Sequence, residues 1–147
     1  MRLITILLLL AVLVGCTASS KTSDPEADAV AKLSALPDAN PAKYRGVTGM
    51  GAWQNPYLII KPDGVGLVDL PNNEIHILKP DEVSEALARR DASAWPYGRV
   101  VAMEEGPTTS DEEKAKLRAN RGIVTGALEG EKVQIQWMPP ESSKSRK

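Results

Sequence analysis

Few residues in this sequence have the type and spacing that acid–base chemistry requires. His76 is the only histidine, and no partner for a general acid or base stands at a suitable spacing from it, so we expect it to face solvent on a strand. Asp63 and Glu104 are the carboxylates best placed for a hydrolase, which stays as an alternative function. Glu104 and Glu105 are adjacent on an expected strand and would point to opposite faces of the sheet.

Metal and cofactor sites are not predicted. A zinc site needs three or four ligands, and the chain has one histidine and one cysteine. The segment Gly64-Val65-Gly66 lacks the third glycine and the following helix of a phosphate-binding loop. The 18 basic and 19 acidic residues give a net charge of −1, which lacks the basic excess typical of nucleic-acid binding.

Cys16, the only cysteine, follows a short apolar segment at the N-terminus. Met1-Arg2 supplies a basic start, residues 3–14 are mostly apolar, and Leu13-Val14-Gly15-Cys16 ends the segment. These are the features of a secretory signal peptide with a small residue before the cut. The last four residues resemble the lipobox of bacterial lipoproteins. This resemblance implies that residues 1–15 are removed and that Cys16 becomes the acylated first residue of the mature chain.

The lipobox resemblance also implies a location. Residues 3–14 are fewer than the roughly 20 apolar residues that a membrane-spanning helix needs, whereas the acyl chains of a lipoprotein suffice for stable anchoring. Thr17 stands where an aspartate would favour retention at the inner membrane, so we expect the outer membrane, with the domain in the periplasm. Acylation would occupy the only thiol, which leaves none for a disulfide or a nucleophile.

The sequence divides into four segments. They are a signal peptide (1–15), a lipidated tether with a short helix and an extended lead-in (16–56), an α+β domain (57–138) and a disordered basic tail (139–147). Pro25 opens the short helix, which has Val30 and Leu33 on one side. Residues 37–56 are rich in Pro, Gly and Asn, which is typical of irregular backbone.

Apolar runs predict the elements of the domain. The expected strands cover residues 58–61, 65–69, 75–78, 100–103 and 132–137. Helices are expected after Pro80, with an apolar stripe of Val83, Ala86 and Leu87, and after Ser110. Strand–helix–strand connections favour parallel, right-handed crossovers. We therefore expect an α+β fold: a small mixed sheet of four to five strands with two helices on one face, in the order ββ(β)αβαβ.

The start and the apolar side of the second helix are both visible in the sequence. Ser110 and Glu113 have the S-x-x-E spacing of a capping box. Leu117, Val124 and Leu128 continue an apolar stripe with the helical period. A helix that begins directly after Ser110 and extends past residue 120 satisfies both signals.

Two glycines make the end of this helix ambiguous. Gly122 and Gly126 each cost about 1 kcal/mol relative to alanine inside a helix, and they lie four residues apart on one face, which would allow close approach to the sheet. The competing interpretation ends the helix near Arg121 and pairs residues 123–128 with residues 132–137 as a hairpin. We favour the helix.

Two segments of the domain resemble a known family. Pro62-Asp63-Gly64 follows a strand, and residues 75–83, Ile-His-Ile-Leu-Lys-Pro-Asp-Glu-Val, lead from a strand into a helix. Residues 57–137 thereby resemble the periplasmic domain of the ExbD/TolR biopolymer-transport family, which implies a module that pairs with itself, with another envelope protein or with the cell wall. The family's functional aspartate lies in an N-terminal membrane helix without a counterpart here, so no proton coupling is expected. Residues 55–105 also resemble a group of uncharacterised bacterial proteins.

Five aromatic residues flank the expected strand ends. They are Trp53, Tyr57, Trp95, Tyr97 and Trp137. Tryptophan and tyrosine combine a flat apolar face with a polar group, which suits binding interfaces. Such residues more often close the ends of a small core; as the alternative, they would form an interaction surface for sugar rings of the cell wall or for a partner protein.

The sequence thus predicts a lipid-anchored envelope protein that acts as a non-catalytic binding module. Its expected partners are the membrane, through lipid on Cys16, another envelope protein or peptidoglycan, and a second copy in a homodimer. The chain ends in Lys144-Ser145-Arg146-Lys147, which resembles the end of the murein lipoproteins. That resemblance implies an alternative, a structural lipoprotein joined to peptidoglycan through Lys147. A carboxylate-based hydrolase is the third hypothesis.

Overall fold

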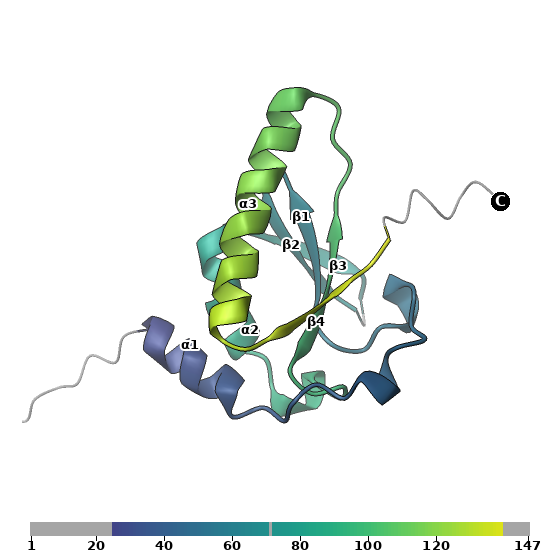
Figure 1. Cartoon of the computed structure of the whole chain (residues 1–147), viewed down its shortest axis with the longest axis vertical. Coiled ribbons are helices and arrows are strands. Elements are labelled where there is room, and N and C mark those ends of the chain that lie inside the picture. Colours follow the sequence, from purple (N-terminus) through teal and green to yellow (C-terminus); the bar gives the residue numbers. More distant parts are fainter. Residues whose placement is uncertain (1–24, 71, 140–147) are drawn as a thin grey trace, which may run out of the picture.

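The structure is a computed structural model that describes residues 25–70 and 72–139. Within these residues, three α-helices and five strands build an α+β fold (Figure 1). The helices are α1 (Pro25–Ser34), α2 (Val83–Ala88) and α3 (Asp111–Gly130), and the strands are β1 (Tyr57–Lys61), β2 (Gly64–Asp69), β3 (Glu74–Leu78), β4 (Val100–Glu105) and β5 (Gln134–Trp137). The predicted signal peptide, Cys16 and the predicted tail from residue 140, including Lys147, lie outside the described residues.

All five strands belong to one mixed sheet, in the order β3-β2-β1-β4-β5. The pairs β1–β2 and β2–β3 are antiparallel, because each is joined by a short turn. The pairs β1–β4 and β4–β5 are parallel, and their connections contain helices. The predicted mixed sheet with parallel crossovers is confirmed. At the β3 edge, Ile75 and Ile77 are 44% and 49% exposed, and an open edge of this kind suits pairing with another strand.

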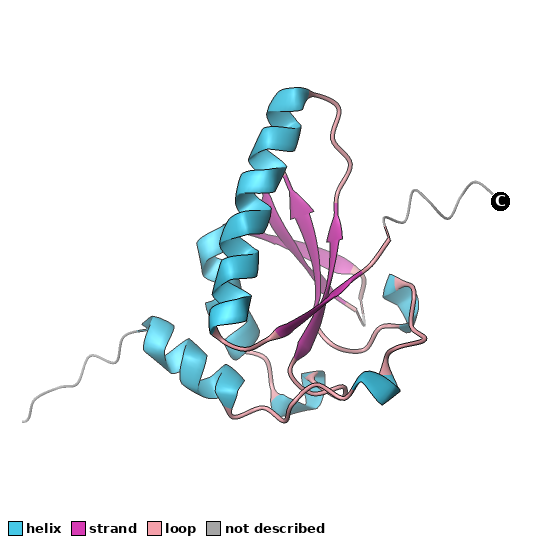
Figure 2. Ribbon diagram, in the orientation of Figure 1, coloured by secondary structure: helices cyan, strands magenta, loops and turns pink. Residues whose placement is uncertain are grey.

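Helices α2 and α3 cover one face of the sheet, as predicted (Figure 2). This core joins apolar side chains of the two central strands with those of both helices: Leu58, Ile60, Val101, Met103, Val83, Leu87, Leu117, Val124 and Leu128. Helix α1 packs against α2 and contributes Leu33 to the same core. The apolar stripes predicted on the two helices are therefore the sides that they bury.

The other face of the sheet is covered by the lead-in segment, residues 39–56. Its side chains Tyr44 and Trp53 pack with Tyr57 of β1 and with Tyr97 in a second core. Strands β1 and β4 are buried on both sides, and a strand of that kind needs cover on each face. The packed fold therefore begins before residue 57, and the boundary expected there is corrected.

Asn55 fastens the lead-in segment to the start of β4. Its Nδ2 donates hydrogen bonds to the carbonyl oxygens of Gly98 and Val100, both at 2.7 Å, and its Oδ1 accepts one from the N–H of Tyr97 at 2.9 Å. The side chain is buried, and these three bonds satisfy its amide. The lead-in segment is thus held by specific polar contacts as well as by its aromatic rings.

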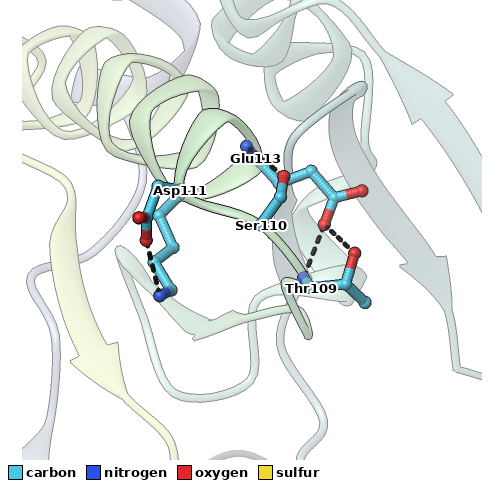
Figure 3. A network of polar contacts seen from close by, with 5 residues as sticks. Thr109, Ser110, Asp111 and Glu113 are labelled. Atoms are coloured by element: carbon cyan, nitrogen blue, oxygen red, sulfur yellow. Dashed lines mark hydrogen bonds and ion pairs between the residues drawn. The ribbon is translucent and has the colours of Figure 1, made fainter.

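Helix α3 begins at the predicted capping residue (Figure 3). Ser110 Oγ accepts a hydrogen bond from the N–H of Glu113 at 3.1 Å. The Glu113 carboxylate reaches back to Thr109, whose N–H and hydroxyl donate to it at 2.6 and 2.9 Å, and these bonds hold the pKa of Glu113 below its ordinary value. The helix continues to Gly130, so the helical interpretation of residues 122–129 is confirmed and the hairpin alternative is wrong.

Candidate functional site

Four of the five aromatic residues considered for an interaction surface are buried. The exposed fractions are 2% for Trp53, 1% for Tyr57, 4% for Trp95, 6% for Tyr97 and 44% for Trp137. Trp53 and Tyr97 stack edge to face in the second core, with ring centroids 5.0 Å apart, while Trp95 packs in the core under the helices. Both faces of the sheet are covered and these four rings fill the two cores, so the interpretation that they close a small core is confirmed and the alternative of an aromatic interaction surface is wrong.

The carboxylates considered for hydrolysis do not share one face of the sheet. Glu104 is buried and accepts a hydrogen bond from the Tyr57 hydroxyl at 2.6 Å. Glu105 lies on the opposite face, where it pairs with Arg121 of α3, so the opposite orientation predicted for these neighbours is confirmed. Asp63 is exposed in the turn between β1 and β2, and His76 is exposed on β3. No group of three or more histidine, cysteine, aspartate or glutamate side chains within residues 25–70 and 72–139 could hold a metal ion.

A groove with a volume of about 630 Å³ lies between α1, α2 and α3. The first turns of α1 contribute Glu26 and Val30, α2 contributes Ser84, and the last turns of α3 contribute Gly126. Glu131, directly after α3, also lines it. The volume falls within the range of about 300–1,000 Å³ that is typical of ligand sites. We call this feature the acidic groove.

The lining of the acidic groove has one sign of charge. Its ionisable side chains are Glu26, Asp81, Glu85 and Glu131, and neither lysine, arginine nor histidine lines it. Glu85 also pairs with Arg89, at 2.5 Å, on the exposed side of α2. A concave surface lined by one sign of charge concentrates the field inside it, so the groove attracts cations.

Glu131 is the polar group in this groove that the fold leaves unsatisfied. The residue is 5% exposed, and its Oε2 has no hydrogen-bond partner among the described residues. Burial raises the pKa of the carboxyl above its ordinary value; the Ser84 hydroxyl opposes this rise in part through hydrogen bonding, and the negative charge of Glu26 adds to it. Leaving a buried acceptor unsatisfied costs about 1–3 kcal/mol. A cation bound in the groove would remove that penalty.

Five small residues form a line along the outward side of α3, bordered by the exposed charged side chains of Glu112, Lys116, Arg118 and Glu129. We call this line the small-residue stripe, and its members, all exposed, are Ala115, Ala119, Gly122, Gly126 and Gly130. A Cβ atom built on any of the three glycines would have no atom of the protein within 4 Å. The expectation that Gly122 and Gly126 face the sheet is therefore wrong. Each lies two residues from the buried Val124, and at about 100° per residue this places both on the opposite side of the helix.

The sequence analysis missed both Glu131 and the groove. For the small-residue stripe, a signal was present: its members are opposite the predicted apolar stripe of Leu117, Val124 and Leu128, where an exposed helix face normally has charged side chains. For Glu131 there was no signal, because its surroundings include Glu26 of α1 and Ser84 of α2, which are far from it in the sequence.

Between residues 25 and 70 and between residues 72 and 139, no helix combines the length and the apolar character needed to cross a bilayer. Comparisons with protein-family models, with curated proteins and with solved structures find no match to this chain. The resemblances to bacterial lipoproteins and to the ExbD/TolR domain therefore remain predictions, and the function is argued from the geometry described above.

Proposed function

We propose that this protein is a non-catalytic binding module, tied to the bacterial envelope by lipid on Cys16, and that its binding site is the acidic groove. The lipobox resemblance of residues 13–16 supports the anchor, and Thr17 favours the outer membrane, with the folded domain in the periplasm. The groove replaces the aromatic surface as the binding site, because most of those rings are buried.

The observation that supports binding in the groove is the unsatisfied carboxylate oxygen of Glu131. A ligand-sized cavity with a convergent polar group and a perturbed pKa is the default binding-site hypothesis for a fold of unknown function. Glu104 and Glu105, for comparison, both have partners within the chain. Among the described residues no group partners Oε2 of Glu131, and a basic group of a ligand that enters the groove could supply that partner.

The anchor would keep the groove close to the membrane. Nine residue steps separate Cys16 from Pro25, where α1 begins, and a fully extended chain of that length spans about 30 Å at most. The groove includes residues of the first two turns of α1. The proposed partner is therefore an envelope component that reaches within a few tens of ångströms of the lipid surface.

Fractionation of cells that produce the full-length chain tests the anchor. We expect the protein in the membrane fraction, with an intact mass that shows cleavage before Cys16 and added acyl chains, and we expect the Cys16→Ala variant to lose both properties. An unmodified thiol in the wild-type protein would contradict the anchor.

A photo-cross-linking amino acid tests the groove in the same cells. Placed at Ile123, which lines the groove, it should form a cross-linked product that the Glu131→Gln variant reduces. Placed at Asp63, in the exposed turn between β1 and β2, it should not form that product. Equal products from both positions would contradict the groove as the binding site.

A further inference from the structure

The small-residue stripe leaves the backbone of α3 open to close contact. From Ala115 to Gly130 it extends for about 22 Å, at 1.5 Å per residue. Packed helices normally lie 8–10 Å apart, at a distance set by the side chains between them. Glycine and alanine on one helix let a second helix come closer than that, as the small-xxx-small pattern does in helix pairs. A Cβ atom at Gly122, Gly126 or Gly130 would meet no atom of the described chain within 4 Å.

The acidic groove adjoins the stripe at its C-terminal half. Gly126 and Gly130 belong to the stripe and also line the groove with Glu131. Val30 and Ile123, at the rim, are 37% and 52% exposed. An occupant that lies along the stripe therefore meets apolar side chains at the rim and carboxylates inside the groove.

We infer that the acidic groove and the small-residue stripe together bind a helix of a partner protein, one whose apolar side carries a lysine or arginine that reaches Glu131. This inference rests on the proposed function and specifies its partner. An amphipathic helix in a groove is an established mode of recognition. The basic side chain follows from charge complementarity, because every ionisable group of the groove lining is acidic. The helix follows from the length of the stripe and from the spacing of its small residues, four apart at Ala115–Ala119, Gly122–Gly126 and Gly126–Gly130.

Two synthetic helical peptides test this inference with the full chain, purified in a non-ionic detergent. Both are 18-residue alanine–leucine helices; one carries lysines beside its leucine stripe, and the other carries glutamates at the same positions. We expect the lysine peptide to bind at least about ten-fold more tightly, since a buried charge that gains its partner contributes more than one factor of ten. Equal binding of the two peptides, or no binding of either, would overturn the inference.

Substitutions of single carboxylates then locate the charge contact. Glu131→Gln should weaken binding of the lysine peptide about ten-fold or more. The matched control is Glu74→Gln, which removes the same charge from an exposed residue of β3 that belongs to neither the groove nor the stripe, and it should change binding less than about two-fold. Equal losses from the two variants would show attraction by net charge alone and would overturn the inference.

Added bulk on α3 tests the close approach of the partner helix. Gly126→Leu should abolish selective binding of the lysine peptide, while Lys114→Leu, which adds the same side chain to another side of α3, should not. The far-ultraviolet spectrum of each variant reports whether the fold is kept. Wild-type binding by a folded Gly126→Leu variant would overturn the inference. Membrane attachment through Cys16 is measured separately, so the peptide result and the anchor can fail independently.

Discussion

At the scale of single residues, Glu131 combines burial with an unsatisfied oxygen, and this gives stability a defined pH dependence. Its folded-state pKa is raised, so the folded protein holds the proton more tightly than the unfolded chain does. The stability contributed by the protonated carboxyl is complete below the ordinary pKa of 4.5 and is lost as the pH rises through the raised pKa. Ionisation of this carboxyl in the folded protein therefore costs stability.

We predict that Glu131→Gln increases the free energy of unfolding at neutral pH by about 1–2 kcal/mol. The gain should disappear below pH 4.5, the ordinary pKa of the carboxyl, where the wild-type side chain is also neutral. Urea unfolding at the two pH values measures both quantities. The exposed control Glu129→Gln should stay within about 0.5 kcal/mol of the wild type at each pH. A loss of stability in Glu131→Gln at neutral pH would contradict this prediction.

Residue type and local sequence predicted the exposure of some side chains but not of others. His76 could be placed correctly because an isolated histidine in an alternating strand needs no partner. The aromatic residues could not be placed with certainty, because a tryptophan near the end of a strand, such as Trp53 or Trp95, has the same local sequence whether it faces solvent or a core. Only the packing of the lead-in segment decides between the two, and its Pro-, Gly- and Asn-rich composition does not indicate where it packs.

At the scale of elements, the regular periods of apolar residues predicted the structure well. The continuous run of Val100 to Met103 became a strand with neighbours on both sides, and the stripe of Leu117, Val124 and Leu128 became the buried side of α3. The end of the sheet at β5 was less predictable. The strand begins at Gln134 rather than at residue 132, because Lys132 turns the chain with a φ of 59° directly after α3.

Helix α3 contains glycines that its own fold does not require. We predict that Gly122→Ala and Gly126→Ala each increase the free energy of unfolding by about 1 kcal/mol, because alanine has the higher helix propensity and its Cβ would meet no other atom. Ala119→Gly, on the same stripe, should decrease it by a similar amount. Thermal or urea unfolding of the three variants measures these changes. Destabilisation by either alanine would show that the stripe is packed within the folded chain.

Alanine and leucine substitutions at the two glycines distinguish the effect of the stripe on stability from its effect on binding. If the stripe exists for a partner helix, Gly122→Leu and Gly126→Leu lose selective binding of a lysine-bearing helix although the alanine variants unfold less readily than the wild type. A helix that keeps destabilising glycines for a contact outside the chain is an example of stability given up for function.

At the scale of the whole molecule, the protein is a sheet between two unequal layers. Helices α2 and α3 form one layer, and the lead-in segment forms the other. Helix α1 follows the proposed tether in the sequence, and its first turns line the acidic groove. The lead-in segment is therefore a structural layer of the fold rather than a spacer before it.

This arrangement predicts that the lead-in segment unfolds together with the sheet. Trp53→Ala should decrease the free energy of unfolding by about 3–5 kcal/mol, because it removes a buried tryptophan from the second core. Trp137→Ala, at a residue that is 44% exposed, is the matched control and should cost less than half as much. Urea unfolding followed by circular dichroism measures both.

A single domain has only about 5–15 kcal/mol of stability, so a chain that starts at Tyr57 should not show a cooperative transition. A cooperative transition of the shortened chain, with its midpoint unchanged, would contradict the two-layered fold as one unit.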